Sequence, residues 1–185
     1  MDQINFNNNR VQVVGEFKVI TNMTDNDIKF FFPDLGLCNI PHSGYPCCVV
    51  HMDKNQEIPA GDAWTNLVWE VNDVDNRGMH SVTVNPERIN IPQSGDYELD
   101  LKVEMEATER LLGMVRFLKN GVEEIPRSSV TEFGSIAGSV MDMVSNQPYI
   151  HLDARDYIVA QVRHDGDTVK QVSSDQSYFS CRRIY

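Results

Sequence analysis

The sequence predicts an all-β fold in which short antiparallel strands form a β-sandwich. Helical periodicity is nearly absent, whereas apolar and polar residues alternate along several segments. Turn-forming residues separate these segments about every ten residues, a spacing typical of sandwiches and barrels. A chain of 185 residues is also long enough to form such a core without disulfides or metals.

The clearest alternation lies in the middle of the chain, over residues 95–107. Its even-numbered positions from 98 to 106 are all charged. One face of this strand must be buried and the other must face water, because successive side chains point to opposite sides of a sheet. A register shift by one residue would bury the charges, so the pairing is strongly specified. The apolar positions are Tyr97, Leu99, Leu101, Val103 and Met105.

The remaining strands are expected in short runs on both sides of this one. Asn120-Gly121 between two apolar runs is the strongest hairpin signal, because these residues readily adopt the positive φ of a tight turn. The expected strands are 11–20, 28–32, 47–52, 64–71, 81–84, 88–91, 95–107, 111–119, 135–144, 157–163, 168–172 and 178–184.

A change in composition near residues 56–62 divides the chain. The part before it is rich in asparagine and contains three consecutive phenylalanines and three of the four cysteines. In the part after it the alternation is cleaner and the charge density is higher. We therefore expect a β-rich N-terminal segment over residues 1–57 and a sandwich domain over residues 58–185, joined at Ile58-Pro59-Ala60-Gly61.

The charge balance excludes several classes of partner. With 27 acidic and 16 basic residues, the formal net charge is −11. Such a surface repels phosphate backbones and anionic lipid headgroups, so we expect neither nucleic-acid binding nor membrane insertion. No stretch is apolar enough for a membrane helix, and the N-terminus lacks the apolar core of a signal peptide. The sequence predicts a protein made in a cytoplasm that does not use the ordinary secretory route.

Catalytic motifs are missing from the sequence. There is no nucleophile elbow, phosphate-binding glycine loop or zinc-protease motif. A catalytic arrangement of histidines brought together in space stays open, although nothing local favours one. We expect no enzyme, no catalytic residues and no cofactor. The five histidines are His42, His51, His80, His151 and His164.

Two segments raise the question of a metal. Cysteines and histidines gather between residues 38 and 51, but they lack the paired Cys-x-x-Cys spacing that makes zinc sequences specific. Buried thiols and surface imidazoles are the favoured interpretation, and zinc is the alternative. Residues 72–78 faintly resemble a calcium loop but lack its further ligands, so a solvated acidic turn is favoured. The first group is Cys38, His42, Cys47, Cys48 and His51.

The two tryptophans flank one apolar strand. Trp64 and Trp69 stand at positions of opposite parity, so they point to opposite faces. One of them is expected in the core. The other is either a partly exposed indole or a contact with a neighbouring molecule, and the sequence favours neither.

Several segments of the second part follow one another in a recognisable order: 64–69, 78–81, 85–92, Ser94-Gly95-Asp96-Tyr97, 116–121, 152–158 and 177–180. From about Gly61 to Tyr185 this order resembles the tumour-necrosis-factor-like (TNF-like) jelly roll, which is shared with the globular heads of the first complement component. Two positions depart from the family pattern: Arg155 stands where glycine is preferred, and Cys181 follows Ser180 where glycine is usual.

The resemblance implies a compact homotrimer whose aromatic-rich sheets pack around a three-fold axis. We expect no catalytic or metal site. The residues expected to form core or trimer contacts are Trp64, Trp69, Tyr97, Tyr157, Tyr178 and Phe179.

The phrases Gly78-Met79-His80-Ser81 and Asn85-Pro86-Glu87-Arg88-Ile89 look most like those of virus- and phage-encoded members. This resemblance implies a non-enzymatic virion structural protein, such as a capsid decoration, head fibre or tail-fibre component, assembled in the host cytoplasm. The N-terminal segment is expected to bind other virion proteins, and loops 73–79 or 121–131 to contact a host glycan or receptor. The alternative is a soluble bacterial TNF-like binding module or surface adhesin.

Overall fold

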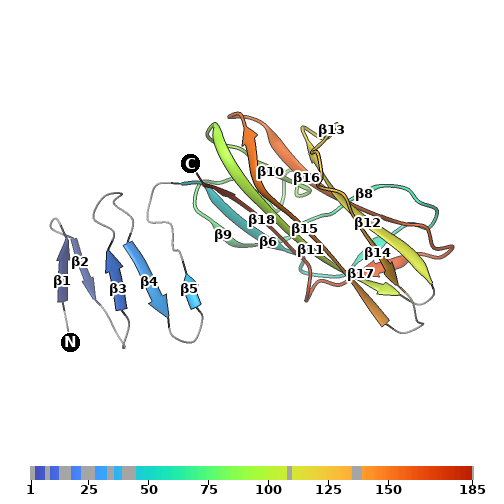
Figure 1. Cartoon of the computed structure of the whole chain (residues 1–185), viewed down its shortest axis with the longest axis horizontal. Coiled ribbons are helices and arrows are strands. Elements are labelled where there is room, and N and C mark those ends of the chain that lie inside the picture. The colour runs from blue at the N-terminus through green and yellow to red at the C-terminus, as the bar shows by residue number, and fades with distance from the viewer. Residues whose placement is uncertain are drawn as a thin grey trace. The chain divides into compact units, whose positions relative to one another are not determined.

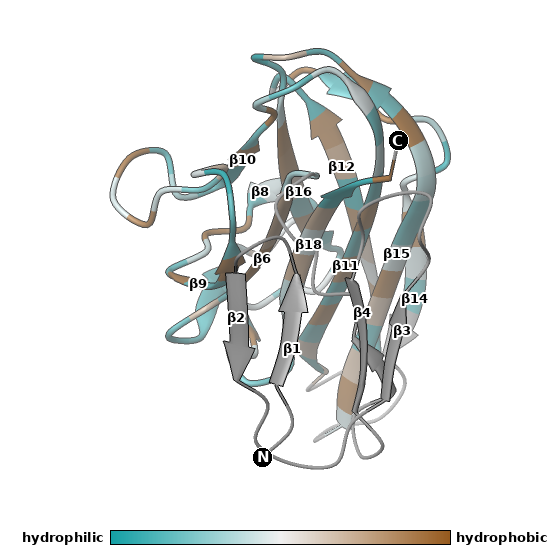
Figure 2. Ribbon diagram, turned by 90° about the vertical axis from the view of Figure 1, so that its left-hand side faces the viewer, coloured by the Kyte–Doolittle hydropathy of each residue, from teal (hydrophilic) through white to brown (hydrophobic). Residues whose placement is uncertain are grey.

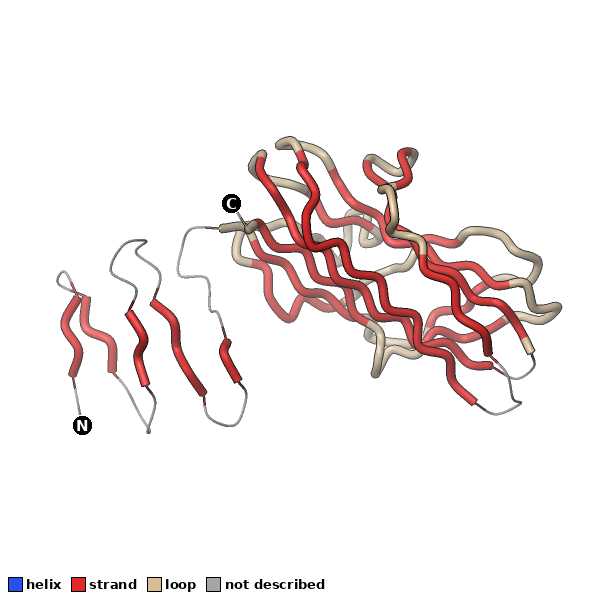
Figure 3. The backbone as a smooth tube through the Cα atoms, in the orientation of Figure 1, coloured by secondary structure: helices blue, strands red, loops and turns tan. Residues whose placement is uncertain are grey.

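The computed structural model describes residues 45–107, 110–132 and 139–184 with their side chains, together with the backbone of residues 133–134 and of five N-terminal strands. Every regular element in these segments is a β-strand (Figure 3). No helix in the described segments could span a membrane. The chain divides into two compact units, Met1–Gly44 and Tyr45–Tyr185.

The first unit contains two small antiparallel sheets. One consists of β1 (Gln3–Phe6) and β2 (Asn9–Gln12), and the other has the order β3 (Lys18–Thr21), β4 (Ile28–Phe32) and β5 (Gly36–Cys38). The β-rich character expected of the N-terminal segment is therefore present. Strand β4 has the bounds that the sequence predicts, whereas the strand expected over 11–20 corresponds to parts of β2 and β3.

The second unit is a sandwich of two antiparallel sheets (Figure 1). In the larger sheet, β11 (Gly95–Ala107) pairs with β15 (Ser139–Leu152) on one side and with β17 (Lys170–Val172) and β18 (Tyr178–Arg183) on the other. Beyond these lie β7 (Gln56–Ile58), which pairs with β17, and β6 (Cys47–His51) and β9 (Val71–Asp75), which continue from β18.

The smaller sheet is centred on β12 (Leu111–Lys119) and β16 (Tyr157–His164), which pair with each other. Strands β13 (Glu123–Glu124) and β14 (Val130–Gly134) pair with β12, while β8 (Thr65–Asn66) and β10 (Arg88–Asn90) pair with β16. The predicted all-β antiparallel sandwich is confirmed.

The core lies between the two sheets and is rich in aromatic residues. Trp69, Tyr97, Phe117 and Phe179 are fully buried, and the Phe179 ring centroid lies 6.0 Å from that of Trp69 and 5.2 Å from that of Phe117. The hydroxyl of Tyr97 donates a hydrogen bond to the carbonyl oxygen of Gln93 at 2.6 Å, and burial raises the pKa of Tyr97 to about 12. The predicted alternation along β11 is confirmed, because its odd-numbered side chains from 97 to 107 are buried.

The division between the units falls earlier than residues 57–58, where the change in composition placed it. Strand β6 pairs with β18 over five residues, and its Cys48 and Val50 are fully buried. Strand β7 pairs with β17 in the same sheet. The change in composition reflects which residues face water, but the extent of the unit depends on which strands are buried and paired. The sandwich therefore begins at Tyr45.

Two expected strands are not continuous strands in the structure. The segment 64–71 contains only the two-residue β8 and the first residue of β9. Between them, the amide of Leu67 donates to the carbonyl oxygen of Ala160 and that of Trp69 to the carbonyl oxygen of Pro86. The segment 81–84 is a loop, because the hydroxyl of Ser81 accepts the amide hydrogens of Thr83 and Val84. Apolar residues are present in both segments. Isolated bonds to distant residues in the first segment, and local bonds to the Ser81 hydroxyl in the second, take the place of a continuous ladder.

Candidate functional site

The outward face of β15 carries a row of exposed apolar side chains. Val140, Val144 and Tyr149 are 60%, 52% and 63% exposed, whereas Met141 and Met143 between them point into the core. Among the strands that the structure describes, β15 pairs only with β11, so it forms an edge of the larger sheet. Figure 2 shows the resulting bands of polar and apolar residues along β15. Exposed apolar residues on an edge strand are typical of contact surfaces.

A single carboxylate fixes the aromatic end of this row. Asp96 on β11 accepts a hydrogen bond from the Tyr149 hydroxyl at 2.9 Å, and its other oxygen lies 2.8 Å from Nδ1 of His151. The hydrogen bond with His151 lowers the pKa of Asp96, and the bond from Tyr149 acts in the same direction. Both rings are thus exposed and held in place. We call Val140, Val144, Tyr149 and His151 the β15 row.

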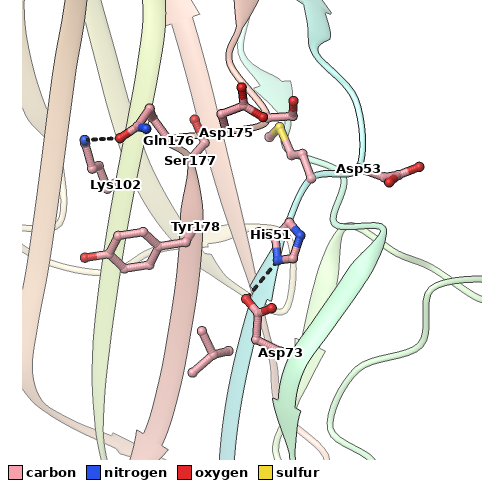
Figure 4. A pocket seen from close by; sticks show the side chains of 11 residues that line it. His51, Asp53, Asp73, Lys102, Asp175, Gln176, Ser177 and Tyr178 are labelled. Atoms are coloured by element: carbon pink, nitrogen blue, oxygen red, sulfur yellow. Dashed lines mark hydrogen bonds and ion pairs between the residues drawn. The ribbon is translucent and has the colours of Figure 1, made fainter. Parts of the chain in front are cut away.

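A hollow of about 690 Å³ opens on the same face of this sheet, on the far side of β11 from β15, where β6 ends and β18 begins (Figure 4). Its polar lining comes from β6, β9, β11, β18 and the loop before β18, segments far apart in the sequence. The lining residues are Val49, His51, Met52, Asp53, Asp73, Lys102, Ser174, Asp175, Gln176, Ser177 and Tyr178.

Hydrogen bonds hold the polar side chains of the hollow. Nδ1 of His51 lies 2.8 Å from Oδ2 of Asp73, and Nζ of Lys102 lies 3.5 Å from Oε1 of Gln176 (Figure 4). The Tyr178 hydroxyl donates to Asp100 at 3.1 Å. Burial raises the pKa of Tyr178, and the neighbouring Asp100 raises it further. Tyr178 therefore stays a neutral donor at physiological pH.

The histidine–aspartate pair of the hollow lacks a nucleophile. In the described segments, no hydroxyl group hydrogen-bonds to the second ring nitrogen of His51. The hydroxyl of Ser177 accepts the amide hydrogen of Glu104 and so belongs to the sheet backbone. The arrangement can bind and orient a polar molecule, but it does not provide the relay that activates a serine.

Of the residues considered for zinc, the three whose side chains the structure describes do not form a ligand set. Cys47 and Cys48 are successive residues of β6 and point to opposite faces, with Cys48 in the core and Cys47 half-buried. The ring of His51 is engaged by Asp73. The side chains of Cys38 and His42 lie outside the described residues. The described part of the chain contains no group of three or more potential metal ligands.

The segment that resembles a calcium loop consists of the end of β9 and the turn that follows it. The carboxylate of Asp75 accepts amide hydrogens from Met79 at 2.8 Å and from His80 at 3.1 Å. These bonds direct its oxygens toward the backbone of its own loop. Loop 73–79, which was expected to contact a host molecule, is therefore closed on itself around Asp75, although Asp73 at its start lines the hollow.

The six residues expected in core or trimer contacts fall into two groups. Trp69, Tyr97 and Phe179 lie in the core. Trp64, Tyr157 and Tyr178 are half-buried on the outer faces of the sheets. Tyr157 is covered by Arg88, whose guanidinium carbon lies 4.8 Å from the ring centre, while Tyr178 lines the hollow.

Sequence reasoning did not find the β15 row or the hollow. Along β15 apolar residues occur at both even-numbered and odd-numbered positions, with valines on one face and methionines on the other. The pattern therefore does not show which face is exposed to water. No short sequence motif indicates the hollow, because its residues come from segments that are far apart in the sequence. Only the pairing of strands brings His51, Lys102 and Tyr178 together.

Comparison with known proteins identifies the fold. No protein-family model matches the chain, and no curated protein matches it. Among solved structures, a crystal structure of murine APRIL at pH 5.0 matches with a TM-score of 0.52 and 14% identity, over 76% of this chain and 100% of that one. Eiger TNF from S. frugiperda matches with a TM-score of 0.53 and 10% identity, over 76% of this chain and 93% of that one.

The chain has a TNF-like jelly-roll fold. A second murine APRIL structure, at pH 8.0, gives the same result with a TM-score of 0.53 and 12% identity. The likeness spans the whole of these jelly rolls, but at such low identity it concerns architecture alone. The fold that the sequence resemblance implied is confirmed, and function must be inferred from the surface of this chain.

Proposed function

We propose that this TNF-like jelly roll is a non-enzymatic structural protein of a virion, used as a capsid decoration, head fibre or tail-fibre component, and that it assembles as a homotrimer. The observation that carries the assembly proposal is the β15 row. Three large apolar side chains stand in one line on an edge strand and are more than half exposed. Monomeric proteins rarely leave such a line uncovered, because its burial on association is favourable.

The charged residues around the row favour a specific contact over non-specific hydrophobic association. Across the sheet, β11 presents Glu104 and Glu106 opposite Asp142 and Val140. Lys102 faces Val144, and its ammonium group lies 3.5 Å from Asp142. A contact through the row must place these charges against suitable partners, so one orientation is favoured over others.

Light scattering of the purified chain tests the assembly. We expect a mass near three times 21.1 kDa at micromolar concentration. Replacing both Val140 and Val144 by aspartate should reduce the mass to that of a single chain. Matched controls are Val122→Asp and Val169→Asp, which alter valines 84% and 55% exposed outside the row and should leave the mass unchanged. A wild-type mass of one chain would contradict the trimer.

The virion role is supported by the resemblance of residues 78–81 and 85–89 to virus- and phage-encoded sequences. Cryo-electron microscopy and quantitative mass spectrometry of intact particles test it. We expect the chain on the outside of the particle, in copy numbers divisible by three. A chain limited to residues 45–185 should still form a trimer but should fail to attach to the particle, because the N-terminal unit is proposed to bind other virion proteins. Absence from purified particles would favour the bacterial adhesin instead.

A further inference from the structure

We infer that the hollow between β6, β9 and β18 binds a small neutral saccharide. The inference rests on the proposal that the chain stands on the outside of a virion, and it gives that exposed surface a binding site and a ligand class. It does not depend on the trimer. The volume of about 690 Å³ lies within the range of about 300–1,000 Å³ that is usual for small-ligand sites.

The hollow offers hydrogen-bond donors and acceptors close together. Lys102 and the ring of His51 supply nitrogen atoms, while Asp53, Asp73 and Asp175 supply carboxylate oxygens. A sugar hydroxyl both donates and accepts a hydrogen bond, so a ring that carries several hydroxyls can satisfy both kinds of group at once. The amide of Gln176 offers a donor and an acceptor in one side chain.

Apolar surface accompanies these polar groups. Val49 lines the hollow. The ring of Tyr178 lies beside it (Figure 4). The faces of a sugar ring carry C–H groups that pack against such surfaces, whereas its edges carry the hydroxyls. Orientation by a few polar groups over an apolar contact is the usual design of small-ligand sites.

The charges of the hollow argue against ionic ligands. Three aspartates repel a phosphate, sulfate or carboxylate, and the one ammonium group, that of Lys102, already faces Asp142 at 3.5 Å. A cationic ligand gains little, because Asp73 is paired with His51 while Asp53 and Asp175 are exposed to water, where ion pairs are weak. A neutral ligand with many hydroxyls fits best.

The supporting structure of the hollow is firm. The side chain of Asn55 accepts hydrogen bonds from the amide of Ser174 at 2.9 Å and from its hydroxyl at 3.1 Å, which anchors the loop that carries Asp175 and Gln176. His51 and Tyr178 stand on paired strands and occupy directly opposite register positions. Both are fixed further by Asp73 and Asp100.

The test is binding of the full chain to an array of neutral hexose and N-acetylhexosamine oligosaccharides, followed by saturation-transfer NMR with the best binder. We expect Gln176→Ala and Asp73→Asn each to weaken binding at least tenfold. The matched control Asp167→Asn changes an exposed aspartate outside the hollow and should bind as the wild type does. Light scattering of the same samples monitors assembly separately.

The outcomes separate this inference from the trimer. A trimeric wild type that binds no neutral saccharide at millimolar concentration overturns the saccharide site and leaves the assembly proposal standing. Binding that survives both substitutions, or that a lysine-rich peptide displaces, also overturns it. Binding shown by the Val140→Asp, Val144→Asp double variant but not by the assembled chain would make the hollow a subunit contact, contrary to the inference. Binding by a chain that scatters as a monomer supports the site while contradicting the trimer.

Discussion

The guanidinium carbon of Arg116 lies 4.0 Å from the centre of the Trp64 ring. Arg163 also lies over this ring, at 4.7 Å. Each arginine is held by a carboxylate, Arg116 by Glu124 at 2.9 Å and Arg163 by Asp62 at 3.0 Å. Trp64 is therefore covered on the outer face of the smaller sheet by residues of its own chain, which leaves Trp69 as the tryptophan of the core.

Truncation of the two tryptophans should have different effects. We expect Trp64→Ala to lower the free energy of unfolding by about 1–2 kcal/mol, because it removes two cation–π contacts at a half-buried site. Trp69→Ala should lower the free energy of unfolding by about 3–5 kcal/mol, as is usual when a large aromatic side chain in a core is truncated. Urea unfolding measures both. The trimer mass should survive Trp64→Ala; its loss would place Trp64 in the assembly contact instead.

Asp156 joins two turns and should make stability depend on pH. It accepts hydrogen bonds from Nζ of Lys119 and from Nδ2 of Asn120, each at 2.8 Å. Burial acts to raise the pKa of Asp156, but these hydrogen bonds outweigh it, so the pKa lies below its usual value. A carboxylate with a lowered pKa in the folded state stabilises the fold above its unfolded pKa, and this stability is lost as the pH falls through the folded value.

Asp156→Asn should therefore destabilise the fold by about 1–2 kcal/mol at pH 7, in line with the loss of charged hydrogen bonds. The difference from the wild type should shrink between pH 7 and a strongly acidic pH, because the carboxyl group becomes protonated as the pH falls through its lowered folded pKa. Urea unfolding at the two pH values tests this. If the variant and the wild type differ in stability by the same amount at both pH values, the charge of Asp156 does not contribute to the stability of the fold. Asp167→Asn, in an exposed turn, is the control and should have little effect.

Arg155 occupies a backbone conformation that suits glycine. Its φ is 81°, in the left-handed region, where an L side chain costs about 1 kcal/mol. We expect Arg155→Gly to raise stability by a few tenths to about 1 kcal/mol, since relief of strain exceeds the added freedom of the unfolded chain. An unchanged or lower melting temperature would contradict this. The TNF-like pattern expects glycine at this position, and the conformation is kept although the residue differs.

The opposite change, from glycine to a residue with a side chain, can be made at Gly121 in the hairpin turn. Gly121 has φ of 73°, and a Cβ atom added there would lie 3.0 Å from the Tyr157 hydroxyl. Gly121→Ala should therefore lower the melting temperature, with a cost of at least about 1 kcal/mol. Equal stability of this variant and the wild type would show that the turn can adopt another conformation.

The thiols of the sandwich should react slowly while the protein is folded. Cys48 and Cys181 face each other across β6 and β18, and both are fully buried. Burial raises the pKa of both thiols, and it also raises the pKa of half-buried Cys47. Because the thiolate is the nucleophile, alkylation at pH 8 should be much slower in buffer than in urea. With Cys38→Ser, rapid modification of three thiols in buffer would refute the prediction.

Parts of the fold could be predicted closely because local chemistry agrees with the tertiary arrangement. Gly95–Ala107 and Leu111–Lys119 have the bounds that the alternation indicates. Asn120 and Gly121 both adopt positive φ, as a tight hairpin turn between such strands requires. One tryptophan, Trp69, lies in the core as expected, although neither tryptophan stands on a strand and the parity argument does not apply to them.

Other parts depend on contacts that a sequence does not display. Residues 145–152 look like a loop because they include polar residues and Pro148, yet β15 continues through them. Pro148 lies where the pairing with β11 shifts register, and proline is tolerated at such positions on an edge strand. The hollow likewise depends on pairing between distant strands, so neither part of the candidate surface has a local signature.

Asp96 holds Tyr149 and His151 before any partner arrives. An exposed side chain that must become ordered on association loses rotational entropy, worth about 0.5–1.5 kcal/mol for each one. These two rings have already lost much of that freedom on folding. The affinity of the β15 row for its partner is therefore tuned partly by a residue beside it, and Asp96→Ala should act mainly by speeding dissociation.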